Sequence, residues 1–541
     1  MGVTLERNIK NWLLETVKPD EFMEKDPKVS GINFEALVAQ SKIREVAKEF
    51  LSQSYFLESL TAVDFSECFE VVYHFNSWKP QDRSCVKILV AKDSNHAPSL
   101  SSIYKSALWF EREVCEMFGI TFDGHPNLKK LLLPESSEIH PLLKSFKGEP
   151  KGADVTESLK LIEEDAKDFD VAYPKSITQH EKDYYLNLGP QHPSTHGVLR
   201  ILLHLNGERV LDAEPILGYS HRHHEKMMEI QNYLACWPNF GRLDYVGAMS
   251  YNFGYARLVE RAMSVEIPPR VEYIRVITTE LNRITSHLLW LGTFLMDLGA
   301  MTPFFYCFDD REQILDILEM ATGERLTYDY FRFGGVDHDI PEEFVPAIKK
   351  FMPDFKKRLR EYHNLIGKNI IFRKRVQGLG VLTKENALLY GVTGPCLRAS
   401  GVALDERRRD PYSLYPQLDF EVPTQNDGDV YARYMVRMKE MEESLKIISQ
   451  LIDKIPAGPF KAGKLPKNVP KGEYYSAVES PRGTFGIYLV SDGSLNPYRM
   501  KLRTPSFSNL NSLIDLVPGV FISDVVAVLG SIDIVLPEID R

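Results

Sequence analysis

Two histidines, two prolines and a Ser-Thr pair lie within nine residues of this chain, from Gly189 to Gly197. The runs 184–188 before them and 198–205 after them are rich in residues typical of strands, and Asn206-Gly207 is a hairpin turn signal. Proline fixes φ and blocks strand pairing, so we expect a stiff loop between two strands. Such a loop can hold an imidazole in place for proton transfer. From the spacing alone, an ordinary turn with solvent-exposed histidines fits equally well.

The loop sequence GPQHPSTHGVLR resembles the signature loop of the 49-kDa subunit of respiratory complex I, the proton-pumping quinone reductase. Six further blocks of the same resemblance follow in family order: Gly241–Tyr245 (GRLDY), Pro268–Arg270 (PPR), Leu298–Phe305 (LGAMTPFF), Gly334–Val336 (GGV), Leu397–Gly401 (LRASG) and Glu479–Gly483 (ESPRG). One block alone would be weak evidence, whereas a series in order from residue 184 to the C-terminus is strong.

The resemblance assigns proton donation at the quinone to His196, the second histidine of the loop, and to Tyr245 of the GRLDY block. A His with a pKa of about 6.5 and a Tyr with a pKa of about 10 suit this work. The family also pairs the histidine with an aspartate that matches Asp297. Loss of a proton from His196 would leave Asp297 uncompensated, which could trigger pumping. Without the resemblance, Asp297 is more simply an ordinary capping or salt-bridge acid.

Three further residues are expected near the quinone or the partner's cluster: His192, Thr195 and Arg222. Arg222 matches a family arginine near the terminal iron–sulfur cluster of a partner subunit, where a cation would raise the reduction potential. Many relatives carry a histidine at the position of Thr327, also close to that cluster. Because threonine does not titrate near neutral pH, we expect the potential to depend less on pH here, in keeping with a lower-potential quinone such as menaquinone.

His221, His223 and His224 lie within four residues, as in metal-binding tracts. On a helix, His223 would not share the face of the other two, and no cysteine or acidic cluster completes a site, so we expect no metal. The six cysteines are Cys68, Cys85, Cys115, Cys236, Cys307 and Cys396. They form no C-x-x-C pair, which fits reduced cytoplasmic thiols and predicts neither an iron–sulfur cluster nor a structural zinc in this chain.

The composition is that of a globular protein, with 44% hydrophobic and 26% charged residues in 541, enough for about two to four domains. A net charge of −10 argues against a nucleic-acid surface. No signal, transit or myristoylation pattern is expected at the N-terminus. Asp297 and Pro303 interrupt the apolar run His287–Tyr306, so we expect a buried bundle helix and contact with a membrane through partners only.

Apolar periodicity predicts a multidomain α+β protein. Strands are expected at 70–75, 86–90, 184–189, 198–205, 209–217, 485–490 and 499–503. Helices are expected at 42–50, 109–119, 221–236, 244–264, 270–298, 303–320, 341–366, 429–455 and 509–517. The clearest is 270–298, where Ile274, Ile277, Leu281, Ile284, Leu288, Leu291, Leu295 and Leu298 recur every three or four residues. We expect a small antiparallel sheet, a central helical bundle, which the resemblance relates to the large subunit of nickel–iron hydrogenase, and a mixed C-terminal segment.

Residues 1–146 predict a small α/β domain. Its densest block, Trp109–Ile120 (WFEREVCEMFGI), predicts a helix with an acid–base–acid face that ends at Gly119 and is more often structural or docking than catalytic. The block is similar to the 30-kDa subunit of complex I. The family's Pro-Leu-Arg-Lys-Asp is Pro141–Ser145 (PLLKS) here, which puts a partner contact in doubt. Residues 147–180 predict a linker and 181–541 the 49-kDa-like domain, an order that resembles the fused subunits of some bacteria.

Other functions remain open. A membrane-bound nickel–iron hydrogenase needs two C-x-x-C pairs, but Val535 and Glu538 stand at the C-terminal pair and Cys236 is alone near the other. A ferredoxin-driven quinone reductase would share the same core, since this chain has no G-x-G-x-x-G for a nicotinamide. A non-catalytic scaffold would not need the three proton-handling residues together.

The resemblance thus implies a fused subunit of a bacterial, proton-translocating NADH:quinone oxidoreductase. It would be a peripheral subunit on the cytoplasmic side of the inner membrane and would form one wall of the pocket for ubiquinone or menaquinone. The expected partners are the subunit that holds the terminal 4Fe–4S cluster and the membrane subunit at the quinone entrance. We expect no nucleic acid and no metal bound by this chain.

Overall fold

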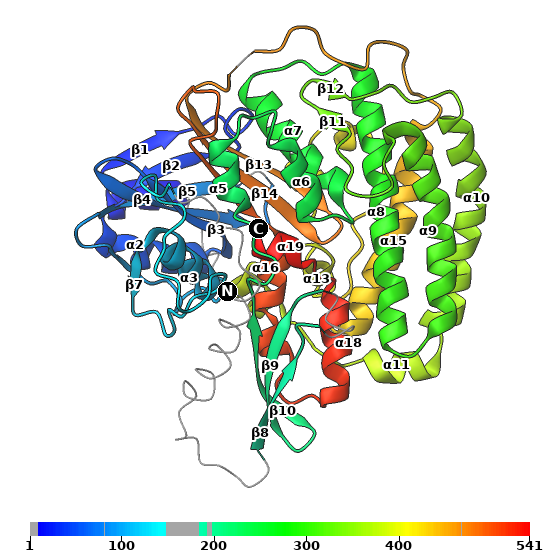
Figure 1. Ribbon diagram of the computed structural model, residues 1–541, viewed down its shortest axis with the longest axis horizontal. Helices are drawn as coiled ribbons and strands as arrows, with labels where there is room; N and C mark the ends of the chain where they lie inside the picture. The colour runs from blue at the N-terminus through cyan, green and yellow to red at the C-terminus, as the bar shows by residue number, and fades with distance from the viewer. Residues whose placement is uncertain (1–8, 81, 148–182, 192–196, 467) are drawn as a thin grey trace, which may run out of the picture.

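The computed structural model describes residues 9–80, 82–147, 183–191, 197–466 and 468–541. In Figure 1 the N-terminal elements lie on one side of the molecule and the long helices on the other, with C-terminal elements between them. The architecture is multidomain and mixed α/β, with several separate sheets. Among the described helices, none is long and apolar enough to cross a membrane.

The N-terminal domain is built on a five-stranded sheet. In spatial order its strands are β1 (Glu21–Glu24), β2 (Phe34–Leu37), β5 (Arg83–Ala91), β4 (Cys68–Ser77) and β3 (Tyr55–Asp64). β2 and β5 run parallel, and the other neighbours run antiparallel. The remaining elements are α1 (Ile9–Trp12), α2 (Ile43–Ser52), α3 (Ala107–Phe118) and the paired strands β6 (His96–Pro98) and β7 (Thr121–Asp123). As predicted, α3 ends at Gly119, whose φ of 77° suits glycine.

Both faces of this sheet are buried, because successive side chains of a strand point to opposite sides. Val71 and Tyr73 of β4 face the core that contains α2 and α3, whereas Val72 between them faces the C-terminal sheet. The C-terminal sheet contributes Tyr475 and Tyr488 to that second cluster. The N-terminal domain is therefore packed directly against the rest of the chain.

Two further three-stranded sheets are antiparallel. The first contains β8 (Asp183–Leu188), β9 (Arg200–Asn206) and β10 (Arg209–Ile216), with the predicted turn at Gly207, φ 59°. It extends away from the body in Figure 1. The second contains β13 (Gly472–Ser480), β14 (Gly483–Ser491) and β15 (Arg499–Arg503). The short strands β11 (Phe331–Arg332) and β12 (Gly335–Val336) pair with each other.

The helical bundle packs around one long helix, α8 (Pro269–Asp297). Its neighbours are α7 (Ala248–Ala262), α9 (Met301–Thr322), α15 (Val430–Leu451) and α18 (Ile522–Ile532), with α10 (Phe344–Tyr362) beside α9 and α15. The shorter helices are α5 (His224–Ile230), α6 (Trp237–Leu243), α11 (Ile370–Val376), α12 (Lys384–Tyr390), α13 (Gly394–Arg398), α14 (Glu406–Arg409), α16 (Pro505–Asn511), α17 (Leu513–Leu516) and α19 (Leu536–Asp540). The predicted apolar stripe of α8 is buried, apart from Leu298 just beyond its end, which is half-buried.

Three sequence predictions are wrong in detail. The expected helix 221–236 is only α5, because His223 has a left-handed φ of 53° and Gln231 is extended. The expected helix 244–264 begins later, at Ala248. The apolar run His287–Tyr306 is not one helix, because it breaks after α8 at Gly299, φ 87°, and continues into α9.

Candidate functional site

A tight turn between α6 and α7 carries the candidate tyrosine. The side chain of Asp244 is fully buried, and its Oδ1 accepts hydrogen bonds from the backbone N–H groups of Val246 at 3.2 Å and Gly247 at 3.0 Å. Aspartate favours this local bond, which ends one helix and starts the next. Asn282 of α8 fastens the turn by donating to the Val246 carbonyl at 2.8 Å. The local fold therefore fixes the backbone of Tyr245.

Arg482, from the tight turn between β13 and β14, binds the other carboxylate oxygen of Asp244. Its Nη1 donates to Asp244 Oδ2 at 2.7 Å and to Ser286 Oγ of α8 at 3.2 Å. Its Nη2 donates to Asp533 Oδ1, after α18, at 3.5 Å. The GRLDY and ESPRG blocks, more than 200 residues apart in sequence, thus meet in one buried ion pair.

The phenol of Tyr245 is half-buried. Burial raises the pKa of Tyr245; the charge of Arg482 lowers it, and the carboxylates of Asp244 and Asp533 raise it. A neutral phenol of this kind can donate a proton to a bound oxygen.

Asp297 lies at the last residue of α8, beside α18. A Cβ built on Gly530 would lie 3.9 Å from Asp297 Oδ2, and Trp290 Nε1 donates to the Gly530 carbonyl at 2.7 Å. Eleven residues of helix separate Asp297 from Ser286, or about 16 Å along the axis. Asp297 lies beside α18, and the Tyr245 turn is linked through Arg482 to Asp533 just after that helix, so both lie near α8 and the end of α18, at different levels.

The predicted residues His192, Thr195 and His196 lie outside the described residues. The next described residue, Gly197, lies against the C-terminal segment, since a Cβ there would be 3.3 Å from Leu536 Cδ1. This segment also carries Asp533. The described end of the histidine loop is thus close to the elements that hold Tyr245.

Arg222 is exposed in the loop before α5. Beside it, His221 Nε2 and His223 Nδ1 are 3.1 Å apart, and the other ring nitrogen of His221 bonds the Asp540 carbonyl. His224 instead contacts Asn239 at 3.1 Å. His221 and His223 therefore face each other while His224 has a different partner, and the described residues contain no group of three or more His, Cys, Asp or Glu side chains that could hold a metal ion.

Thr327 lies next to the GRLDY block. A Cβ on Gly241 would be 3.2 Å from the Thr327 carbonyl oxygen and 2.9 Å from that of Tyr328. The close approach requires glycine at 241. The structure therefore brings Thr327 into contact with the segment that leads to Tyr245.

Helix α3 docks the N-terminal domain on the rest of the chain. Glu113 binds Lys501, and its Oε2 accepts from Arg541 Nη2 at 2.8 Å, all three being buried. On the same helix, Glu116 accepts from the backbone N–H groups of Leu131 to Leu133. These contacts give α3 a structural role in joining the two parts of the chain.

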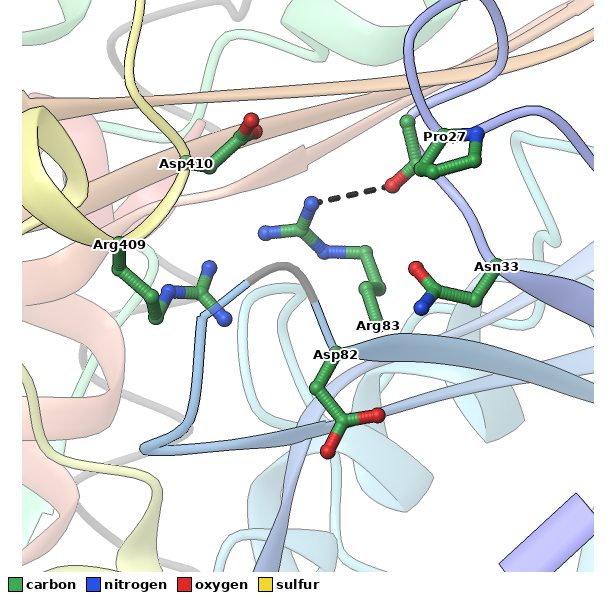
Figure 2. A pocket seen from close by; sticks show the side chains of 7 residues that line it. Pro27, Asn33, Asp82, Arg83, Arg409 and Asp410 are labelled. Carbon is green, nitrogen blue, oxygen red and sulfur yellow. Dashed lines mark hydrogen bonds between the residues drawn. The ribbon is translucent and has the colours of Figure 1, made fainter. Parts of the chain in front are cut away.

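A second polar junction between the two parts encloses a cavity of about 10 Å³, shown in Figure 2. Arg83 and Asn33 line it from the N-terminal domain, and Arg409 and Asp410 from the segment at α14. Arg83 Nη1 donates to the Gly31 carbonyl at 3.2 Å. The cavity has room for about one water and does not include Tyr245, so it is part of the domain junction rather than a substrate site.

Two carboxyl groups near Arg482 were not predicted as part of the site. Glu538 was considered only as a position where a nickel thiolate is lacking, and Asp533 was given no function. The pKa of Glu538 is raised to about 7, chiefly by burial and also by the charge of Asp244, with Arg482 acting in the opposite direction. A signal was present in the sequence, because acidic residues are rare in the apolar segment 525–539.

Two family models match the chain. Residues 297–468 and 460–541 match the 49 Kd subunit of respiratory-chain NADH dehydrogenase, and residues 36–152 match its 30 Kd subunit.

Curated relatives cover nearly the whole chain. The fused C/D subunit of NADH-quinone oxidoreductase from Bacteroides fragilis is 41% identical in an alignment of 507 residues that covers 90% of this chain and 96% of the relative. The C/D subunit from Acidiphilium cryptum is 36% identical in an alignment of 579 residues, gaps included, that covers 99% of this chain and 98% of the relative. The separate D subunit from Desulfotalea psychrophila is 52% identical over 367 residues, 68% of this chain and 99% of the relative. The chain belongs to the family of NADH-quinone oxidoreductase C/D subunits, in which the 30-kDa and 49-kDa subunits of complex I are joined in one polypeptide.

Proposed function

We propose that this chain forms one wall of the quinone pocket in the peripheral arm of a bacterial complex I and supplies protons to the quinone. The observation that carries the proposal is the phenol of Tyr245, half-buried on a turn that Asp244, Asn282 and Arg482 hold rigidly. A phenol positioned in this way can donate its proton to a quinone oxygen as electrons arrive from a partner's cluster.

His196 is proposed as the second proton donor and Asp297 as its carboxylate partner. The position of Gly197 against Leu536 supports the first assignment, because it brings the end of the loop close to the segment that carries Asp533. A carboxylate stabilises an imidazolium, so proton loss from His196 would change the electrostatics at the end of α8 and could start proton translocation. His192, Thr195 and Arg222 are proposed to line the quinone pocket or to lie near the partner's cluster.

The other complex I subunits are the partners of this family. We propose contacts with the subunit that holds the terminal 4Fe–4S cluster and with the membrane subunit at the quinone entrance, on the cytoplasmic side of the inner membrane. The substrate would be ubiquinone or menaquinone. We also propose domain limits of 1–146 and 181–541 with a linker at 147–180, and a common origin of the helical bundle with the large subunit of nickel–iron hydrogenase.

The test is donor-to-quinone turnover in membranes that carry wild-type chain or Tyr245→Phe, with NADH and reduced ferredoxin offered separately. We expect NADH turnover to fall by about 100-fold in the variant, because a general acid contributes about that much or more. Tyr73→Phe is a matched control, since the Tyr73 hydroxyl is also buried but has no hydrogen-bond partner among the described residues.

Each outcome leads to a different conclusion. Loss in Tyr245→Phe alone, with the complex assembled, supports the quinone site. Activity with ferredoxin but not with NADH would leave the proposed quinone site in place but show that the electron donor is ferredoxin. Full activity of assembled Tyr245→Phe would mean that the quinone binds elsewhere.

A further inference from the structure

The proposed function uses the arginine of the ESPRG block only as one support of the Tyr245 turn, although this side chain has further contacts in the site. Arg482 is 2% exposed and lies in the turn Ser480–Gly483. Its guanidinium reaches Asp244 at 2.7 Å, Ser286 at 3.2 Å and Asp533 at 3.5 Å. One side chain therefore joins the turn before α7, the middle of α8 and the end of α18.

The three contacts have a geometric consequence for Tyr245. Asp244 is the residue before it, and its two carboxylate oxygens have separate tasks, one on the backbone of the turn and one on Arg482. The guanidinium holds this carboxylate against Ser286, and the planar fork of an arginine fixes both position and direction. Any movement of the phenol that takes its backbone along must break this pair.

The contacts also have an electrostatic consequence. The charged groups that act on the phenol come from three elements: Asp244 from its own turn, Arg482 from the β13–β14 turn and Asp533 from the end of α18. Arginine stays protonated at every physiological pH. Arg482 is thus a permanent positive charge that opposes two carboxylates beside the phenol in a poorly solvated place.

We propose that Arg482 is a positioning residue for quinone reduction, which orients the Asp244–Tyr245 turn and keeps the Tyr245 phenol a sufficiently strong acid to donate its proton. The proposal rests on the proposed function of Tyr245. Through Asp533, Arg482 is also linked to the end of α18, the helix whose Gly530 lies beside Asp297.

The test removes the charge but keeps the shape. In the double variant Arg482→Gln/Asp244→Asn, an amide pair replaces the ion pair. The amide oxygen introduced at position 244 can still accept hydrogen bonds from the backbone of the turn. Because both charges of the pair are removed together, neither is left buried without the other. The control is Arg275→Gln/Glu260→Gln, a buried ion pair between α8 and α7 in which the Arg275 guanidinium donates to Glu260 at 2.6 and 2.9 Å. Both are measured in assembled complex as NADH-to-quinone turnover against pH, beside Tyr245→Phe.

We expect the Arg482 double variant to lose about tenfold in turnover, with the KM for NADH unchanged, because proton donation weakens when the acid weakens. The alkaline limb of its pH profile should move to higher pH, because the variant loses Arg482, which lowers the pKa of Tyr245 more strongly than Asp244 raises it, while Asp533 still raises it. The control pair should keep the wild-type pH profile. Wild-type turnover and profile in the Arg482 double variant, or the same shift in the control, would overturn the proposal.

A single variant covers the case in which the double variant does not assemble. Arg482→Lys keeps the charge but cannot bind Asp244, Ser286 and Asp533 as a fork. We expect a wild-type pH profile and a turnover lowered several-fold; wild-type turnover would exclude the positioning task. If Tyr245→Phe loses activity while the Arg482 variants do not, only this inference fails. If Tyr245→Phe itself is fully active, the proposed quinone site fails.

Discussion

Tyr245 and Asp244 are neighbours in sequence, but their side chains have opposite environments. Asp244 is completely buried, and both of its carboxylate oxygens accept hydrogen bonds from groups fixed by the fold, whereas the phenol of Tyr245 is half-buried. A rigid residue next to a reactive one is a general way to fix a reacting atom without using that atom in the support. At the residue scale, the fold therefore fixes the carboxylate of Asp244 and leaves the phenol of Tyr245 partly exposed to a ligand.

Thr327 allows a prediction at the residue scale. Its carbonyl contacts the segment around Gly241, and threonine cannot take up a proton near neutral pH. We expect the reduction potential of the terminal cluster, measured by redox titration of the whole complex at several pH values, to change little with pH. Thr327→His should make the dependence steeper, because an imidazole with a pKa of about 6.5 would bind a proton when the cluster is reduced.

Thr327→Asn is the control for that titration. The backbone at this position has φ 54°, which asparagine tolerates well, and an amide does not titrate. It should reproduce the shallow wild-type slope. A steep slope in the wild type would show that another group titrates with the cluster.

At the scale of elements, the sequence predicted what periodicity and local residue types determine. Helix α8 follows from its apolar stripe, and the end of α3 follows from Gly119. The limits of α5 could not be predicted, since they depend on a left-handed His223 before the helix and an extended Gln231 after it. The ion pair between Asp244 and Arg482 could not be predicted either, because no sequence pattern relates positions so far apart. The sequence therefore predicted the motifs of the site but not the contacts between them.

Gly247 tests the turn as an element. A Cβ at this position would lie 2.4 Å from Asp244 Oδ2 and 3.1 Å from Pro481 Cδ, so Gly247→Ala must displace the turn. We expect a stability cost of about 1–3 kcal/mol from overpacking. Turnover with NADH and quinone should fall by about tenfold or more, because the phenol moves with the turn.

The matched control is Gly323→Ala at the end of α9. Its φ of 75° penalises alanine, but a Cβ there meets nothing within 4 Å. This variant should cost about 1 kcal/mol and leave turnover unchanged. Equal turnover in the two variants would show that the turn does not position the phenol.

At the scale of the whole molecule, the N-terminal domain and the rest of the chain share a buried interface. Apolar side chains of the N-terminal sheet and the C-terminal sheet form a shared cluster. Buried polar contacts also join the two parts: Glu113 forms ion pairs with Lys501 and Arg541, and Arg409 donates a hydrogen bond to Asn76. Separation of the parts would leave buried charges without partners, so we expect them to unfold together.

His74 lies in this junction and makes its stability depend on pH. Its ring is fully buried between Tyr475 at 4.9 Å and Tyr488 at 4.7 Å, and neither nitrogen has a hydrogen-bond partner among the described residues. The pKa of His74 is lowered to about 3, chiefly by burial; Glu58 opposes the shift, and Arg83 and Lys87 add to it. Because the unfolded chain binds the proton at about pH 6.5 and the folded chain does not, acid between these values favours unfolding.

The difference is measurable by denaturant unfolding of the purified chain at pH 8 and pH 5. Lowering the pH should cost the wild type about 2 kcal/mol more than it costs His74→Phe, which has no proton to bind and keeps an aromatic ring between the two tyrosines. His338→Phe, at an exposed position, should retain the wild-type difference. An equal loss in wild type and His74→Phe would mean that the ring is protonated within the fold. The two sheets would then have to separate enough at this point to admit water.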